Sequence, residues 1–178
     1  MNYPDAHRIM QENLQNKNMH KHSYAVEAGM RAYARKFGED EEMWAVAGVL
    51  HDFDYEKWPQ EHPTKGKPIL EQMNVPANIV QAIQEHGDIP AESLMGKALK
   101  AVDRLSGFVT AVALVRPDKK IGSVEVKSVL KKMKDKGFAA QIDREDLKKC
   151  ADDLGVPFEE HVEIVLRAMQ GIAEKLGL

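Results

Sequence analysis

Apolar residues recur every three or four positions in segment after segment of this chain. That spacing is the period of one face of an α-helix, whereas the strict alternation typical of a half-buried strand is nearly absent. Segment 93–115 is the clearest case, and its apolar face is formed by Ala98, Val102, Leu105, Val109 and Val112. The periodicity therefore predicts an all-α fold.

Gly, Pro and Asn divide this pattern into separate helices, because these residues favour turns and helix ends. Segment 52–62 is aperiodic and contains Pro59, so we expect a loop there. No repeat, low-complexity tract or linker interrupts the chain, which predicts a single-domain helical bundle over residues 1–178. The predicted helices cover residues 4–16, 19–37, 41–51, 63–73, 76–86, 93–115, 123–134, 143–154 and 157–176.

Composition narrows the classes of function. Hydrophobic residues make up 43% of the 178 residues, as in folded domains, and the formal net charge is −3. That balance argues against a general binder of nucleic acid or anionic membranes. No apolar run reaches the ~18 residues of a membrane span, and MNYPDAHRIM lacks the features of a signal peptide. Because Cys150 is the only cysteine, no internal disulfide can form, and we expect a buried thiol in a cytoplasmic protein.

Six side chains of the types that bind metals fall on inward helix faces or at helix ends. A carboxylate on a buried stripe is costly unless a cation pairs with it, so Asp103 needs one. A lone histidine on an apolar face, however, is more often a hydrogen-bonded core residue than a ligand. The spacing alone leaves a metal site and a structural role both open. The six residues, from five segments, are His22, His51, Asp52, His62, His86 and Asp103.

The order and surroundings of these residues resemble the HD superfamily of metal-dependent phosphohydrolases. AVAGVLHDFD resembles the helix end that carries the family's His-Asp pair, EHPTKG resembles its H-P-x-x-G helix start, and ALKAVDRLSG resembles its A-D-x-L-S helix. Asp54 stands where the family often has glycine, so the loop after the pair is expected to differ. The resemblance implies an HD core over about 18–116 and a C-terminal helical extension over about 117–178.

Carried over residue by residue, the resemblance implies a first metal held by His22, His51, Asp52 and Asp103. Asp52 would bridge to a second metal, with His62 and His86 as its further ligands. This mixture of imidazoles and carboxylates suits Mn, Fe, Co, Ni or Zn better than Mg. One or two such ions would generate hydroxide from bound water to attack a phosphomonoester or phosphodiester, and we expect a nucleotide as substrate.

Two further residues are candidates for direct roles in catalysis. Lys65 follows His62 by three residues and is expected to neutralise charge on phosphoryl oxygens; the alternative is an ordinary exposed lysine. Asp54 is expected to orient a ligand imidazole or to protonate a leaving group, and a plain loop carboxylate is the alternative. Lys67 and Arg104 are further candidates for the role given to Lys65.

Other interpretations stay open at the level of the sequence. The same ligand set would permit a di-iron centre that activates oxygen, as in some proteins of the superfamily. The final helix carries an apolar seam from Phe158 to Leu176, which either packs onto its own domain or serves self-association or partner binding in a non-enzymatic module. His7, His20 and His161 have no motif context and are predicted to lie at the surface. The expected partner is a small phosphorylated molecule, not nucleic acid or a membrane.

Overall fold

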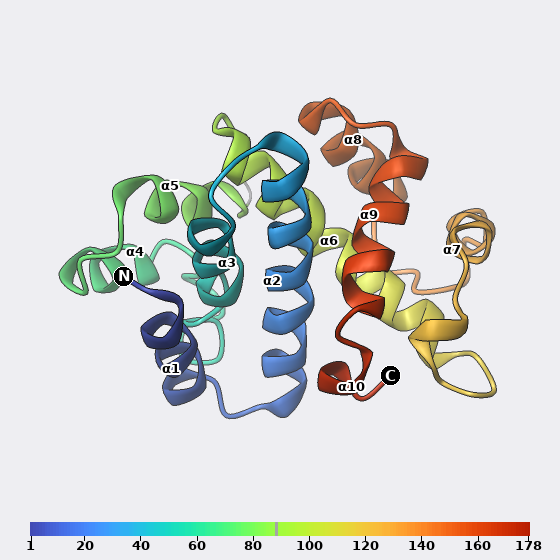
Figure 1. Ribbon diagram of the computed structural model, residues 1–178, viewed down its shortest axis with the longest axis horizontal. Coiled ribbons are helices and arrows are strands. Elements are labelled where there is room, and N and C mark those ends of the chain that lie inside the picture. Colours follow the sequence, from blue (N-terminus) through green and yellow to red (C-terminus); the bar gives the residue numbers. More distant parts are fainter. Residues whose placement is uncertain (88) are drawn as a thin grey trace.

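The computed structural model describes residues 1–87 and 89–178, and over these residues the chain consists of helices and turns with no strand (Figure 1). This confirms the predicted all-α fold. No described helix has the length and apolarity needed to cross a membrane. The helices are α1 (Tyr3–Asn13), α2 (Lys17–Phe37), α3 (Glu41–Leu50), α4 (Gly66–Gln72), α5 (Ala77–Glu85), α6 (Leu94–Leu114), α7 (Val126–Met133), α8 (Arg144–Leu154), α9 (Phe158–Gln170) and α10 (Ala173–Leu176), with a short 3₁₀ turn at Ile121–Ser123.

Two long helices, α2 and α6, form the centre of the molecule. Helix α2 contacts α3, α6 and α9, while α6 also contacts α5 and α8. In Figure 1, α2 runs vertically through the middle, with α6 crossing behind it and α9 alongside. The apolar face predicted for segment 93–115 is buried throughout, and it belongs to one cluster with buried residues of α2, α3 and α9. The centre of the fold is therefore an interface between amphipathic helices.

Caps and left-handed glycines set several helix ends where the sequence predicts them. The side chains of Ser93 and Asp143 accept hydrogen bonds from backbone N–H groups in the first turns of α6 and α8. Gly38 and Gly155 adopt φ values of 71° and 75°, and they end α2 and α8. Glycine is favoured there because a left-handed backbone is strained for residues with a side chain.

The helix predicted from Pro63 begins three residues later than expected. Residues 61–65 form consecutive turns, and α4 starts only at Gly66. Pro68 is the third residue of α4, a position whose N–H has no partner within the helix, so the proline does not break it. As a result, His62 belongs to the turns ahead of α4.

The long helix predicted over 157–176 is interrupted near Gly171. Helix α9 ends at Gln170, and α10 begins after Ile172, whose φ of −124° lies outside the helical range. Glycine at this point lowers the preference for a continuous helix. Helix α9 packs against α2 and α6, so the chain itself covers the apolar seam. The buried residues of this seam include Val162, Val165 and Met169.

Candidate metal centre

The six predicted metal ligands converge on one place in the fold. Five of them line a single cavity of about 410 Å³, and the sixth, His51, is fully buried. Chain segments distant in sequence thus meet at one centre. The predicted ligands come from α2 (His22), the end of α3 (His51 and Asp52), the turns before α4 (His62), the end of α5 (His86) and the interior of α6 (Asp103).

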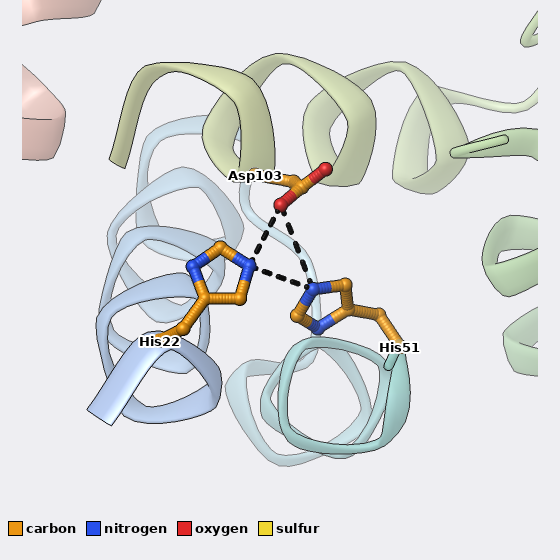
Figure 2. Close-up of side chains that lie close together, drawn as sticks. All are labelled: His22, His51 and Asp103. Atoms are coloured by element: carbon orange, nitrogen blue, oxygen red, sulfur yellow. Dashed lines mark hydrogen bonds and ion pairs between the residues drawn. The ribbon is translucent and has the colours of Figure 1, made fainter. Parts of the chain in front are cut away.

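His22, His51 and Asp103 form what we call the first group (Figure 2). The Nε2 atom of His22 lies 2.9 Å from Asp103 Oδ1 and 3.2 Å from His51 Nε2. The Nε2 atom of His51 is 3.6 Å from the same Asp103 oxygen. In Figure 2 the two rings and the carboxylate point toward one another from α2, the end of α3 and α6.

Asp52 lies between the first group and a second group, which consists of His62 and His86. Its Oδ2 atom is 3.3 Å from His51 Nε2 and 3.6 Å from His22 Nε2. Its Oδ1 atom is 3.2 Å from His62 Nε2 and 3.6 Å from His86 Nε2, and these two nitrogens are 3.1 Å apart. Each oxygen of one carboxylate therefore faces a different pair of imidazoles.

Hydrogen bonds at the remote ring nitrogens orient two of the imidazoles. His51 Nδ1 donates to the Gly48 carbonyl at 2.8 Å, and His86 Nδ1 donates to the Ile83 carbonyl at 2.5 Å. Each acceptor lies three residues earlier, in the last turn of a helix, where carbonyls have no intrahelical partner. With the proton on Nδ1, the Nε2 atoms of both histidines are available to bind a cation.

His62 is oriented by the carboxylate of Asp54. Its Nδ1 donates to Asp54 Oδ1 at 2.6 Å, and Asp54 is only 1% exposed. The other oxygen, Asp54 Oδ2, has no hydrogen-bond partner among the described residues, which is rare for a buried carboxylate. Asp54 thus contacts a predicted ligand without lining the cavity itself. A carboxylate in this place increases the basicity of the ligating nitrogen.

Two glycines allow the ligand-bearing helices to approach closely. A Cβ atom added at Gly29 of α2 would lie 2.4 Å from the side chain of Val102 on α6, next to Asp103. A Cβ atom added at Gly48 of α3 would lie 2.8 Å from the backbone of Glu27 on α2. Larger residues at either position would force the helices apart. Glycine inside a helical pattern, where it is disfavoured, is the sequence signal for such contacts.

The charges in the cluster raise the pKa values of two histidines and lower those of two carboxyl groups. Burial opposes protonation of His51, but Asp52 and Asp103 outweigh it and raise its pKa well above the ordinary value. For His62, burial is likewise outweighed by Asp52 and Asp54, which raise its pKa to about 9. The pKa values of Asp52 and Asp103 are lowered by the neighbouring histidines in spite of burial. The carboxylates therefore stay ionised and attract positive charge, as protons or as metal ions.

These side chains could hold metal ions. One ligand atom from each member of the first group lies within 4.8 Å of the others, and the same is true of His51, Asp52 and His86. Imidazole nitrogens combined with carboxylate oxygens are a donor set for transition metals. The buried, ionised carboxylates and the oriented rings fit that use.

Comparison with protein families identifies the family of the domain that contains these residues. The model of the HD domain family matches residues 19–107, which is half of the chain. The chain belongs to the HD domain family. HD domains bind divalent metals, and the family consists largely of metal-dependent hydrolases. No curated protein and no solved structure matches the chain significantly.

The basic residues predicted to contact the substrate phosphate do not line the cavity that the predicted metal ligands share. Lys65 is exposed, lies 3.3 Å from Glu61, and lines a neighbouring cavity together with His62. Arg104 and Lys67 each form an ion pair with a carboxylate outside the cluster. Among the predicted catalytic residues, only Asp54 therefore contacts a predicted ligand.

The cavity lined by five of the predicted ligands, which we call the metal-site cavity, is also lined by Pro63, by Gly87 and by two residues without a predicted role, Met19 and Tyr55. Met19 precedes His22 by three residues, on the same face of α2. Tyr55 is 43% exposed, and its ring lies edge-on to His62 with the ring centroids 5.4 Å apart. The only signal for Tyr55 is its place directly after the segment that contains the His-Asp pair.

The prediction that His161 lies at the surface is wrong. It is fully buried, its Nδ1 accepts a hydrogen bond of 2.6 Å from the Tyr33 hydroxyl, and its Nε2 donates to the Ala101 carbonyl at 3.2 Å. Burial lowers the pKa of His161 to about 4. The ring lies beside the apolar seam of α9, where it reaches both neighbouring helices. It thereby joins α9 to the helices that carry His22 and Asp103.

His7 and His20 are half-buried, so their predicted surface position is confirmed only in part. His7 Nε2 lies 3.1 Å from the Tyr24 hydroxyl, and His20 Nε2 donates to the Leu14 carbonyl at 2.7 Å. Neither histidine lines the metal-site cavity. Cys150 is buried, as expected.

Proposed function

We propose that this HD domain protein is a divalent-metal-dependent phosphohydrolase that binds two metal ions. The observation that carries the proposal is the position of Asp52, whose two oxygens face the first and second groups separately. A single ion in the first group would leave His62 and His86 without a ligand role, although their Nε2 atoms are only 3.1 Å apart. Mn, Fe, Co, Ni and Zn are the metals that this donor set favours.

The proposed reaction is hydrolysis of a phosphomonoester or phosphodiester, and nucleotides are the first substrates to test. Bound divalent ions lower the pKa of a water molecule and polarise phosphoryl oxygens. The protein's own contribution is to hold the metal-binding side chains in place before the substrate binds. Hydrogen bonds to Gly48, Ile83 and Asp54 serve this purpose, because they fix the imidazoles whose Nε2 atoms face the cluster.

Asp54 and Lys65 receive different roles in this proposal. Asp54 is a positioning residue for His62, since it is buried and does not line the cavity. Lys65 remains a candidate contact for the substrate phosphate, because it adjoins His62 in the neighbouring cavity. To act in this way, its ammonium group would exchange Glu61 for the phosphate.

The test combines elemental analysis with a phosphatase assay on protein purified without chelator or His-tag. We expect about two transition-metal equivalents in the wild type, together with turnover of phosphate esters. The His51→Ala/Asp52→Ala variant should lose both. The matched control is Asp5→Ala/His7→Ala, which removes the same two residue types outside the cluster and should retain the metal and the activity.

Other outcomes would redirect or overturn the proposal. About one equivalent would move His62 and His86 from metal ligands to substrate contacts. A coloured protein with an EPR signal and no phosphatase turnover would point instead to di-iron oxygen chemistry. Absence of metal after reconstitution with Mn, Fe, Co, Ni or Zn would contradict the hydrolase proposal altogether.

A further inference from the structure

A second cavity adjoins the metal-site cavity, and His22 lines both. It measures about 350 Å³ and lies between α2, α6 and the segment 176–178. We call it the His22 pocket. Besides His22 and the segment 176–178, its lining consists of Asn18, Lys21, Gly107, Thr110 and Leu114.

The helix register makes the His22 pocket an extension of the metal site. On α6 the lining residues follow Asp103 at intervals of four, three and four, as Gly107, Thr110 and Leu114. On α2, Asn18 precedes His22 by four residues. Positions with these intervals share one helix face. The helix faces that carry His22 and Asp103 therefore continue into the walls of the pocket, and His22 lines both cavities.

The lining of the pocket has a distinct chemistry. Leu114, Leu176 and Leu178 give it aliphatic walls, and a Cβ atom added at Gly107 would meet open space. Among the residues that the structure describes, no aromatic side chain lines it apart from the imidazole of His22. The exposed aromatic ring at the metal-site cavity, Tyr55, stands beside His62 in the second group.

Lys21 is the cation of this pocket. Within the described residues it has no carboxylate partner within 4.0 Å, whereas Lys65, Lys67 and Arg104 are all paired. Its Nζ atom lies beside Gly177, since a Cβ atom added to that glycine would be 2.9 Å away. The ammonium group of Lys21 therefore lies at the end of the pocket formed by the C-terminal segment.

We propose that the His22 pocket binds the organic group of the substrate, and that this group is aliphatic and carries a second anion that pairs with Lys21. The inference rests on the proposed function, because it assumes a phosphate ester at the metals. It narrows the substrate class, since the described lining offers aliphatic contacts and a lysine, and its one ring, the His22 imidazole, is a predicted metal ligand and not a surface for stacking a nucleobase.

The first experiment changes the volume of the pocket. Metal-loaded wild type and Gly107→Leu are assayed with methyl, butyl and hexyl phosphate, and the binding of methyl- and hexylphosphonate is measured by calorimetry. We expect the wild type to prefer the hexyl compounds in both measurements. In Gly107→Leu the preference for hexyl over methyl should fall at least tenfold. The matched control is Gly122→Leu, at an exposed glycine outside the pocket whose added Cβ also meets open space; it should keep the wild-type preference.

The second experiment removes the charge of Lys21. In Lys21→Gln, the ratio of kcat/KM for a carboxyalkyl phosphate to that for the alkyl phosphate of equal length should fall at least tenfold. Most of this change is expected in KM, because Lys21 lies beyond the reacting phosphate. The control is Lys17→Gln, the same substitution on an exposed lysine of α2 outside the pocket.

The experiments give different results if the proposed role of the His22 pocket is wrong and if the proposed phosphohydrolase function is wrong. If phosphate esters are hydrolysed but Gly107→Leu keeps the chain-length preference of the wild type, the proposed role of the His22 pocket is contradicted and the phosphohydrolase function is supported. The role of the pocket is also contradicted if the wild type prefers a nucleoside monophosphate and if this preference is lost in Tyr55→Ala but kept in Gly107→Leu. The organic group would then bind next to Tyr55. Phosphonate selectivity without turnover of any ester would support the pocket and contradict the hydrolase.

Discussion

The two groups of the candidate metal centre are held in place in different ways. In the first group, His22 and Asp103 belong to the two longest helices, and their helices touch through Gly29 and Val102. In the second group, His62 belongs to turns, and His86 follows the nine-residue helix α5. His22 and Asp103 of the first group are therefore held by helix packing, whereas His62 of the second group is held by hydrogen bonds, above all to Asp54.

This difference predicts different affinities for metal. A ligand on a packed helix is already ordered, so it loses little conformational freedom when it binds a cation. Residues 61–65 have only turn structure around His62, and its side chain is held by contacts with Asp54 and His86. We therefore expect the first group to bind its ion more tightly than the second, with Asp52 shared between them.

The largest effect is expected from removing the ligands that serve the whole centre. The His51→Ala/Asp52→Ala variant loses a nitrogen of the first group and the carboxylate that faces both groups. Phosphatase activity should fall by roughly a hundredfold or more, and bound metal should drop to background. Elemental analysis and steady-state kinetics on the same samples check this. Retention of one full equivalent would show that the two groups do not depend on Asp52 as we describe.

The next prediction separates the two groups. Asp103→Ala should lose the tightly bound ion, whereas His86→Ala should lose only the weaker one and keep about one equivalent. Metal titration by calorimetry, with both variants loaded from the metal-free state, measures the remaining affinity. If His86→Ala retains only the weaker binding step, the order of affinities inferred from the helix packing is wrong.

A smaller effect is expected when the support of the second group is weakened without removing a ligand. In Asp54→Asn the side chain keeps an acceptor for His62 Nδ1 but loses its charge. Affinity for the second ion should decrease roughly tenfold to a hundredfold, while the first ion is unaffected. Glu61→Gln is the control, since this exposed carboxylate near His62 pairs only with Lys65 among the described residues. Equal weakening of both ions in Asp54→Asn would contradict a role confined to His62.

The sequence was informative where a residue's place on a helix decided its environment. Apolar spacing located α6 and the inward side of its face, and helix register together with the family motifs singled out the six predicted ligands before their distances were known. His22 and Asp103 are the best examples, because register alone places them on inward faces of long helices. For these residues, local periodicity and tertiary packing agree.

Residues whose roles depend on non-local contacts could not be predicted in this way. His161 lies beside the apolar seam of its helix, and its partners Tyr33 and Ala101 come from two distant helices. Lys21 lines the His22 pocket together with the segment 176–178, which lies more than 150 residues later in the chain. Lys65 is a different case, since its proximity to His62 in sequence suggested a role at the metal site, whereas its ammonium group pairs locally with Glu61, four residues earlier.

The smallest predicted effect concerns His161, which supports the first group from outside the cluster. Its hydrogen bonds to Tyr33 and Ala101 connect α9 to α2 and α6. Because burial lowers the pKa of His161 to about 4, the unfolded chain binds a proton more readily between about pH 6.5 and pH 4. The folded state must therefore lose stability as the pH falls through this range.

Between pH 7 and pH 5, this single group should lower the free energy of unfolding by about 2 kcal/mol. Urea unfolding of metal-free wild type and His161→Gln at both pH values isolates the contribution of His161 to the free energy of unfolding, because the remaining titrating groups are common to both proteins. His161→Gln should be less stable at pH 7, since Tyr33 and Ala101 lose a well-fitting partner, yet it should depend less on pH. Equal pH dependence in the two proteins would mean that His161 is not held neutral by burial, and the support it gives to the first group would then have to come from packing alone.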